Sequence, residues 1–222
     1  MRKTLFALAA TTLVSSVFAA ELRVGLNPAY EPFESKTPSG EIVGFDVDIA
    51  NALCEQIQRK CVFVESEWDS IIAGLQAKKY DVIISSMSIT PERARVVDFT
   101  QRYYKTPSAI VVKKGTAYTG PASLKGKRIG VLKGSTQEKW AMGELKPAGV
   151  TVVPYEAQDQ VYLDIKSGRL DGTVADILAP ELADDLEAAY TRNQDDAELA
   201  ALFEQAVTAY QAAMMAATSS LA

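Results

Sequence analysis

Short apolar runs alternate with segments of helical spacing along most of this chain. The runs at Glu21–Leu26, Cys61–Val64 and Asp81–Ile84 are typical of strands, and helical segments separate them. The same alternation restarts at Lys127. Strands that alternate with helices form a parallel sheet covered by helices. The sequence therefore predicts an α/β protein with two parallel-sheet lobes, joined by a strand crossing at Ala109–Lys113.

The helical segments of the first lobe carry apolar residues at regular spacing. A second helix is expected over Ser70–Lys78, with Asp69 as its cap. The apolar residues that recur through the first helix predict its buried face. They are Phe45, Ile49, Leu53 and Ile57.

The first residues have the pattern of a secretory signal peptide. Met1–Lys3 is basic, Leu5–Val14 is a short apolar core, and Val17–Ala19 places small residues where signal peptidase cuts. We expect cleavage after Ala19. The apolar core is too short for a membrane span. Residues 1–19 are therefore expected to direct export of a soluble protein.

The chain is acidic and contains no histidine. Loss of Arg2 and Lys3 with the signal peptide takes the formal net charge from −5 to −7. Such a surface disfavours nucleic acid and anionic membranes. The absence of histidine removes the usual general base, the usual nucleophilic triads and the commonest metal ligand. We therefore expect no cofactor and no metal, and no catalytic residue is assigned, although a carboxylate could still act as a catalytic acid.

The two cysteines, Cys54 and Cys61, are the only ones in the chain. In an oxidising compartment a pair at this spacing is expected to form a disulfide. No further metal ligands stand near them. Closing so short a loop stabilises a protein by about 2–3 kcal/mol on the chain-entropy model. The predicted role is structural.

A cluster of hydroxyls follows the predicted strand Asp81–Ile84. Thr90 is a plausible N-cap, Pro91 suits the first helical position, and Arg93 would lie in the first turn. A helix N-terminus with an added arginine forms a binding site for a carboxylate, which the guanidinium can hold through two hydrogen bonds. The alternative is an ordinary capped helix with a solvated arginine. The hydroxyls belong to Ser85, Ser86 and Ser88.

The second lobe presents a complementary set of groups. A glycine-bearing turn at Lys133–Glu138 opens into a helix and carries Ser135 and Thr136, and the strand Gly172–Asp176 ends on a carboxylate. In parallel sheets, ligands bind beyond the carboxyl ends of the strands. Two helix N-termini and Arg93 favour an anion, whereas Asp176 favours a cation. The two lobes together therefore predict a site for a zwitterion.

The chain resembles the periplasmic solute-binding proteins of ABC-type polar amino-acid importers, especially the lysine/arginine/ornithine/histidine branch. This resemblance implies a two-lobed Venus-flytrap fold, a periplasmic location, and a monomer that delivers an L-amino acid to a membrane ABC permease. The implied ligands are lysine, arginine, ornithine, histidine or glutamine. The matching pieces run collinearly and are Tyr30–Lys36, Gly44–Asp48, the Cys54–Cys61 pair, Ser85–Arg93, Gly126–Val131, Gly134–Gln137 and Asp171–Asp176.

The resemblance also implies roles for individual residues. Arg93 matches the residue that grips the ligand α-carboxylate, helped by the main chain at Thr136, and Asp176 matches the acceptor of the α-ammonium. Tyr30 and Trp68 match aromatic walls suited to a flat or cationic side chain; on their own they would more often be core or rim aromatics. The residues matching the rest of the pocket are Ser85, Ser86, Ser88, Leu132 and Ser135.

Asn27 departs from the family pattern, because the basic branch often has an aspartate there to receive a cationic side-chain tip. Asp46 is a possible substitute acceptor. This departure leaves glutamine and histidine as competitors of lysine and arginine for the preferred ligand.

The predicted layout is lobe one at 20–108, a hinge crossing at 109–115, lobe two at 116–180, and an abbreviated return with a C-terminal helix on lobe one at 181–222. Residues 187–193 show no convincing strand pattern. We therefore expect that they do not form a strand, that lobe one is well formed and lobe two incomplete, and that affinity is weaker than in a full-length relative. Two alternatives are a dehydratase-type enzyme on the same scaffold and a shortened relative that does not bind.

Overall fold

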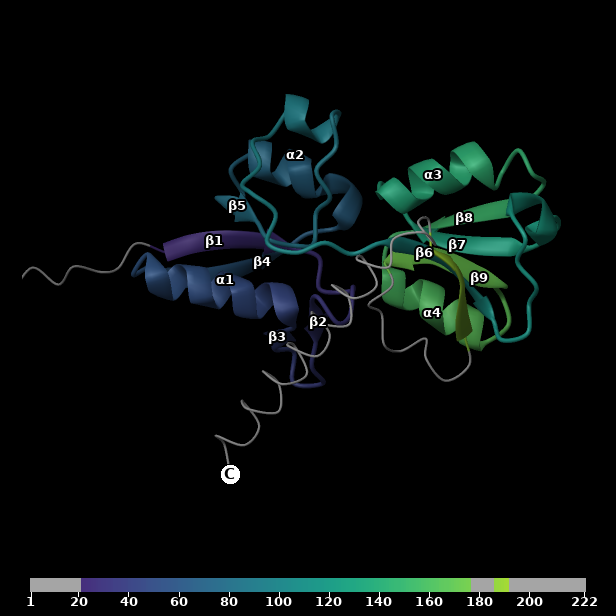
Figure 1. Cartoon of the computed structure of the whole chain (residues 1–222). Helices are drawn as coiled ribbons and strands as arrows, with labels where there is room; N and C mark the ends of the chain where they lie inside the picture. The colour runs from purple at the N-terminus through teal and green to yellow at the C-terminus, as the bar shows by residue number, and fades with distance from the viewer. Residues whose placement is uncertain (1–20, 177–185, 192–222) are drawn as a thin grey trace, which may run out of the picture.

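The protein, described here from a computed structural model over residues 21–176 and 186–191, consists of two α/β lobes side by side (Figure 1). The predicted alternation of strands and helices is confirmed. The chain passes from lobe one to lobe two along residues 99–107 (Figure 1). The predicted signal peptide, 1–19, and the predicted C-terminal helix lie outside the described residues.

Lobe one is built on a parallel sheet of three strands in the order β4-β1-β5. The helices α1 and α2 cover its two faces, with α1 against β4 and α2 against β1 and β5 (Figure 1). A two-stranded antiparallel hairpin, β2–β3, precedes α1. The bounds are β1 Glu21–Leu26, β2 Ser35–Lys36, β3 Ile42–Val43, α1 Phe45–Gln56, β4 Lys60–Glu65, η1 Trp68–Ser70, α2 Ile71–Gln76 and β5 Val82–Ile83.

The predicted buried face of α1 is wrong over the second half of the helix, whereas Phe45 and Ile49 in the first half are half-buried. Leu53 and Ile57 are 50% and 52% exposed, and the buried residues of the helix are Asp46, Val47, Ala50 and Cys54. Two interactions between α1 and other segments determine which face of the helix is buried. Asp46 accepts hydrogen bonds within lobe one, and Cys54 is tied to β4 by a disulfide. These contacts outweigh the burial of two apolar side chains.

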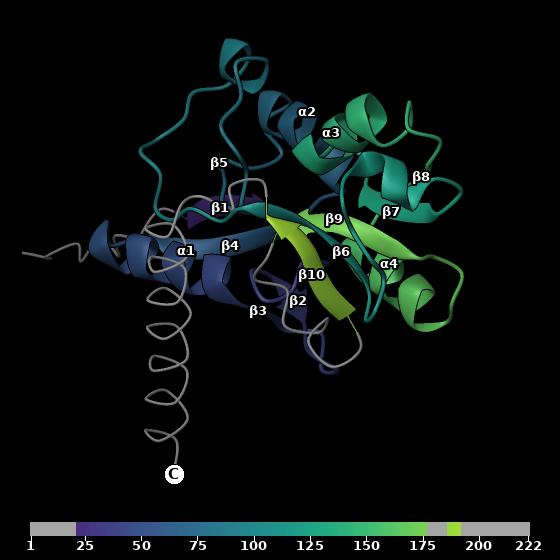
Figure 2. The same cartoon turned by 45° about the vertical axis from the view of Figure 1, so that its right-hand side comes forward.

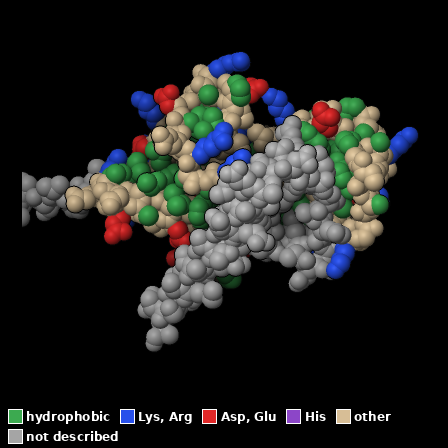
Figure 3. All heavy atoms as spheres, in the orientation of Figure 1, with side chains coloured by type: hydrophobic (Ala, Val, Ile, Leu, Met, Phe, Trp, Pro, Cys, Tyr) green, Lys and Arg blue, Asp and Glu red, His purple; other side chains and the backbone are tan. Residues whose placement is uncertain are grey.

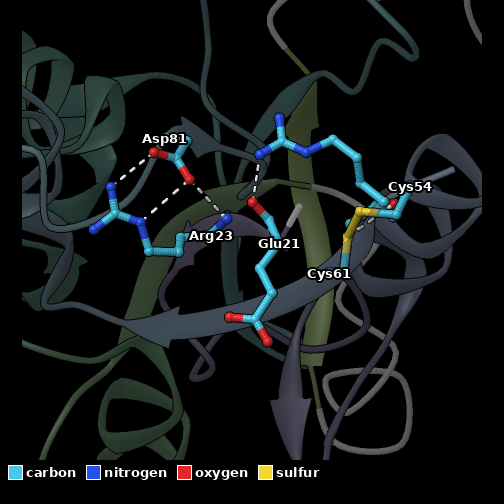
Figure 4. Close-up of a disulfide and its surroundings, with 7 residues drawn as sticks. Glu21, Arg23, Cys54, Cys61 and Asp81 are labelled. Carbon is cyan, nitrogen blue, oxygen red and sulfur yellow. Dashed lines mark hydrogen bonds and ion pairs between the residues drawn. A yellow bond between two sulfur atoms is a disulfide. The ribbon is translucent and has the colours of Figure 1, made fainter. Parts of the chain in front are cut away.

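The predicted disulfide between Cys54 and Cys61 is confirmed. It joins the last turn of α1 to the start of β4, at the end of the sheet where the strands begin (Figure 4). Nearby, the carboxylate of Asp81 accepts from the backbone N–H of Arg23 at 2.9 Å and from its guanidinium at 2.7 Å (Figure 4). These contacts hold β1, β4 and the entry to β5 together.

The helix predicted after Pro91 does not form. The segment makes a single 3₁₀ turn, η2, over Arg93–Arg95, in which Thr90 Oγ1 accepts a hydrogen bond from the backbone N–H of Arg93 at 3.2 Å. Thr90 therefore caps a turn and no α-helix. Because so short a turn has little aligned dipole, the positive charge that this turn directs into the cavity comes from the Arg93 side chain and not from a helix N-terminus.

Lobe two is a sheet of five strands in the order β10-β6-β9-β7-β8. Strands β8 and β9 run parallel to β7, while β6 is antiparallel to β9. Helices α3 and α4 pack against opposite faces (Figure 1). The bounds are β6 Ser108–Lys113, η3 Pro121–Leu124, β7 Arg128–Leu132, α3 Thr136–Glu144, β8 Thr151–Tyr155, α4 Gln158–Lys166, β9 Gly172–Asp176 and β10 Leu186–Thr191. Most of the predicted hinge crossing, 109–115, thus lies within the lobe-two sheet.

Lobe two has an apolar core on each side of its sheet. One cluster places Ile110, Ile129 and Val131 under α3. In the other cluster, Val111 from β6 packs with Val161 from α4. Among the described residues, five of the six large apolar side chains that remain exposed are in lobe one, where apolar surface is visible in Figure 3. Over the described residues lobe two therefore has a five-stranded sheet with a core on each face, which differs from the expectation of an incomplete lobe two, whereas lobe one forms its sheet as expected. The five are Leu53, Ile57, Ile89, Val96 and Tyr103.

Strand β10 overturns the expectation that residues 187–193 do not form a strand. It pairs antiparallel with β6, from Leu186 opposite Lys113 to Thr191 opposite Ala109, with a register shift between Ala188 and Tyr190. Strand β10 thus runs back toward the junction between the lobes (Figure 2). Its local sequence has no strand alternation, and the pairing comes from the hydrogen-bonding edge that β6 offers.

Across residues 21–176 and 186–191, no helix combines the length and the apolar character that a membrane crossing needs.

Candidate functional site

A cavity between the two lobes brings together ten of the twelve predicted ligand-binding residues. Lobe one contributes loops that follow β1, β4 and β5, and lobe two contributes the end of β7, the start of α3 and the end of β9. This is the edge at which parallel strands end, as predicted. The ten are Tyr30, Trp68, Ser85, Ser86, Ser88, Arg93, Leu132, Ser135, Thr136 and Asp176; Glu34, Gln137, Gln158 and Val174 complete the lining.

Arg93 crosses the cavity from lobe one to lobe two. One guanidinium nitrogen donates to the carbonyl of Ser88 at 2.9 Å, and the other donates to the carbonyl of Gly134 at 3.2 Å. The guanidinium carbon lies 5.4 Å from the ring centroid of Trp68, in cation–π contact. Burial lowers the pKa of Arg93 from its ordinary value. Even so, an arginine stays charged, so the cavity holds a partly desolvated cation.

The start of α3 forms the lobe-two wall. Ser135 is its N-cap, and its hydroxyl accepts a hydrogen bond from the backbone N–H of Glu138 at 2.9 Å. The carboxylate of Glu138 in turn accepts from the backbone N–H of Gly134 at 2.7 Å. These reciprocal bonds fix the turn, and they explain why Gly-Ser-Thr-Gln-Glu begins a helix here. The helix N-terminus therefore faces the cavity, as predicted for this lobe.

Asp176 is buried at the end of β9 and is linked to lobe one through Tyr30. The Tyr30 hydroxyl donates to Asp176 Oδ2 at 3.0 Å and accepts from the Asp176 backbone N–H at 3.0 Å. Ser108 and Gln137 donate to Asp176 Oδ1 at 3.1 and 3.0 Å. Burial raises the pKa of Asp176 to about 6, against the opposing effect of these hydrogen bonds. Such a desolvated carboxyl favours a cationic partner.

The two remaining predicted residues, Asn27 and Asp46, do not line the cavity. Asn27 is buried, and its amide donates to the carbonyl of Ser66 at 3.0 Å. Asp46 is fully buried behind the cavity wall, where it accepts hydrogen bonds from Ser86 at 2.7 Å and Tyr103 at 2.9 Å. Both oxygens of Asp46 already have donors, so the expectation that it receives a ligand side chain is wrong for this arrangement.

Sequence reasoning missed four lining residues, of which Glu34 and Gln137 are in direct contact with predicted ones. Both lie inside the pieces Tyr30–Lys36 and Gly134–Gln137 that carry the resemblance, so a signal was present. Gln158 donates to the hydroxyl of Thr173 at 3.2 Å, a contact between α4 and β9 that no local pattern indicates.

The lobes are in direct contact around the cavity. Lys133 pairs with Asp69 at 3.0 Å, and Lys139 pairs with Glu92 at 2.6 Å. The free volume within the cavity is about 20 Å³, which is room for about one water molecule. An amino acid can enter only if the lobes separate, so access to the site depends on their relative movement.

Comparison with known proteins identifies the family of this chain. A model of the bacterial extracellular solute-binding proteins, family 3, matches residues 22–216. The chain is 51% identical over 173 residues to the L-arginine-binding protein of Pseudomonas aeruginosa, covering 77% of this chain and 67% of that protein. It is 42% identical over 186 residues to the histidine-binding periplasmic protein of Salmonella typhimurium, covering 81% of this chain and 72% of that protein.

Comparison with solved structures leads to the same class of periplasmic binding protein. A Salmonella typhimurium periplasmic binding protein solved to explain its high arginine specificity is 33% identical, with a TM-score of 0.73 over 80% of this chain and 81% of that one. The predicted two-lobed fold and the predicted resemblance to amino-acid-binding periplasmic proteins are thus confirmed. The chain belongs to the bacterial extracellular solute-binding proteins, family 3.

Proposed function

We propose that this protein is the substrate-binding component of an ABC importer, which holds a polar or cationic L-amino acid between its lobes. It works in the periplasm as a monomer and delivers the ligand to a membrane permease. The observation that carries the proposal is the meeting of Arg93 from lobe one and Asp176 from lobe two in one cavity. One group suits a carboxylate and the other suits an ammonium, and only an amino acid carries both on one carbon atom.

The α-carboxylate of the ligand takes the place of protein carbonyls around Arg93. In this structure the guanidinium donates to the carbonyls of Ser88 and Gly134. A carboxylate is a stronger acceptor than a carbonyl because charge-assisted hydrogen bonds are roughly twice as strong. The N-terminus of α3, at Thr136, adds its partial positive charge. Replacement of the two carbonyls by the ligand carboxylate at Arg93 is therefore favourable.

The α-ammonium of the ligand binds Asp176. This carboxyl shares a hydrogen bond with Tyr30 across the lobes, and separation of the lobes breaks that bond. An ammonium placed between Asp176 and Tyr30 restores a donor to the carboxylate. The ligand thereby replaces direct contacts between the lobes with contacts through itself, which couples binding to closure.

Binding is favoured over catalysis. The relatives are named as binding proteins, and the family is one of solute-binding proteins. Those relatives bind arginine and histidine, as their names state. For this chain we propose a ligand among arginine, lysine, ornithine, histidine and glutamine. Strand β10 returns toward the lobe junction, so the reason for expecting weak affinity no longer holds.

Titration calorimetry of the mature chain with the twenty amino acids and ornithine tests this proposal. Arg93→Ala should lower affinity for every ligand that binds, because removing one partner of a buried charge pair costs about 2–5 kcal/mol, or two decades or more. The control is Arg95→Ala, which removes an exposed arginine from the same turn. An affinity for Arg93→Ala within threefold of the control, or no binding by the parent protein, would refute the proposal.

A further inference from the structure

We propose that Ser108 is a positioning residue, which holds Asp176 ready for the ligand α-ammonium and so sets the pH range in which the protein binds. The inference rests on the proposed function and adds a residue that does not itself line the cavity. Ser108 is the first residue of β6, directly after the segment 99–107 that joins the lobes. The acceptor of the ammonium is thereby connected to the point at which the chain enters lobe two.

The register of the lobe-two sheet brings Ser108 to Asp176. Strands β6 and β9 are antiparallel, and these two residues lie directly opposite each other. Side chains of directly opposed residues lie on the same face of a sheet, with Cβ atoms about 4.5–5.5 Å apart. The Ser108 hydroxyl therefore reaches Asp176 Oδ1, at 3.1 Å. The next pair in the ladder, Ala109 and Ala175, is buried, so the backbone on both sides of the contact is packed in place.

The surrounding hydrogen bonds fix the direction in which the Ser108 hydroxyl donates. The side-chain nitrogen of Gln137 donates to the Ser108 oxygen and to Asp176 Oδ1, both at 3.0 Å. The Thr136 hydroxyl donates to the side-chain oxygen of Gln137 at 3.1 Å, which orients the amide with its nitrogen toward Ser108. Because the Ser108 oxygen accepts from Gln137, its own proton points to the carboxylate. Three residues of lobe two thus form a closed ring at Oδ1.

The two oxygens of Asp176 have partners in different lobes. Oδ2 accepts from Tyr30 of lobe one, whereas Oδ1 accepts from Ser108 and Gln137 of lobe two. Separation of the lobes removes Tyr30 but leaves both bonds to Oδ1. The carboxyl group therefore keeps its orientation while the site is open, and Oδ2 is free to accept the ammonium. Such preorganisation lowers the cost of ordering the site when the ligand binds.

The Ser108 hydroxyl also favours the ionised form of Asp176. Burial raises the pKa of this carboxyl to about 6, and the hydrogen bonds from Tyr30, Ser108 and Gln137 act in the opposite direction. Loss of the Ser108 hydroxyl therefore raises the pKa further. A protonated Asp176 offers no negative charge to an ammonium, so affinity falls as the pH falls through this pKa. Without the hydroxyl, that fall begins at a higher pH.

Other ionisable groups near Asp176 do not obscure this effect. Burial raises the pKa of Tyr30 and Tyr104 from their ordinary values, so both stay neutral between pH 5 and 8, and an arginine stays charged. Glu34 titrates alike in parent and variant, so a difference between the two proteins reports on Asp176. The groups in the described part of the chain are Tyr30 after β1, Tyr104 from residues 99–107, Tyr162 from α4 beside Tyr30, and Glu34 and Arg93 on the cavity wall.

Titration calorimetry from pH 5 to 8 with arginine, lysine, ornithine, histidine and glutamine tests the inference. Ser108→Thr and Ser108→Val have side chains of the same shape, and only threonine keeps the hydroxyl. Valine also fills space beside a second cavity of about 60 Å³, from which water could replace a lost hydroxyl. Ser108→Thr should bind within threefold of the parent protein. Ser108→Val should lose about tenfold or more at pH 7, and the pH midpoint of its affinity should rise by about half a unit or more.

Two further variants complete the experiment. Ser108→Ala is the smallest change and should shift the midpoint in the same direction, so the test does not depend on the folding of Ser108→Val. Ser167→Ala, at an exposed serine after α4, is the control and should change neither affinity nor midpoint.

The possible outcomes separate this inference from the proposed function. Equal losses for Ser108→Thr and Ser108→Val, or a loss with an unchanged pH midpoint, would show that Ser108 only packs the start of β6. Full affinity of Ser108→Val at every pH would also overturn the inference. In each of these cases the parent protein still binds, so the proposed function stands. If the parent protein binds none of the five amino acids, the proposed function fails and the inference fails with it.

Discussion

Replacing Gly134 by alanine should separate closure of the lobes from stability of the fold. Gly134 has a φ of +74°, in the left-handed region, where an L-residue costs about 1–2 kcal/mol. A Cβ added there would lie 3.1 Å from the Cα of Asp69 in the opposite lobe. That contact is tighter than Cβ atoms usually make, so the backbone of Asp69 would have to move by a few tenths of an ångström, and it arises only when the lobes meet. The backbone penalty therefore acts on the fold, and the steric penalty acts on closure.

The loss on closure can be estimated from the contacts at this place. The carbonyl of Gly134 accepts a hydrogen bond from Arg93, and hydrogen bonds to charged groups are worth about 1.5–3 kcal/mol. If the added methyl group holds the lobes apart, this bond and the adjoining ligand contacts weaken. We therefore expect affinity for the best ligand to fall about tenfold or more.

A second glycine provides a matched control. Gly149 has a φ of +86°, and a Cβ added there would lie 3.1 Å from Cγ of Lys125, a flexible side chain in the same lobe. Gly134→Ala and Gly149→Ala should lose similar melting temperature, whereas only Gly134→Ala should lose affinity by calorimetry. Equal affinities for the two variants would refute the argument that Gly134 is needed for close approach of the lobes.

Three further predictions follow from the described contacts. Because burial raises the pKa of Asp176 to about 6, this group makes the ligand-free protein more stable as the pH falls from 7 to 5. Asp176→Asn should lack that increment in melting temperature, and identical pH profiles would contradict it. Replacing Cys54 and Cys61 by serine should cost about 2–3 kcal/mol in denaturant unfolding with little change in affinity, since the disulfide lies away from the cavity; a matching loss of affinity would contradict this. The double variant Asp69→Asn, Glu92→Gln removes two partly exposed pairs between the lobes and should lower affinity by less than about tenfold; a larger loss would mean that these pairs control closure.

Several features of this protein were determined by the sequence over short distances. The alternation of apolar runs and helical spacing predicted both lobes, because strand and helix periodicity are local properties. The residues that follow each strand were then expected at one edge, since parallel strands end on the same side of a sheet. That reasoning brought Ser85, Arg93, Ser135 and Asp176 to one cavity. The disulfide also followed from spacing and compartment.

Other features depended on contacts between segments far apart in the chain. The rotation of α1 follows from Asp46 bonding to Ser86 and Tyr103, so apolar spacing alone predicted the wrong buried face. Strand β10 forms because the edge of β6 pairs with it, and no pattern within residues 186–191 indicates a strand. Whether a carboxyl has a donor is likewise a tertiary property. At Glu34, only the packing shows that the carboxyl accepts from the hydroxyl of Ser85 and lies beside a second buried carboxyl, that of Asp46.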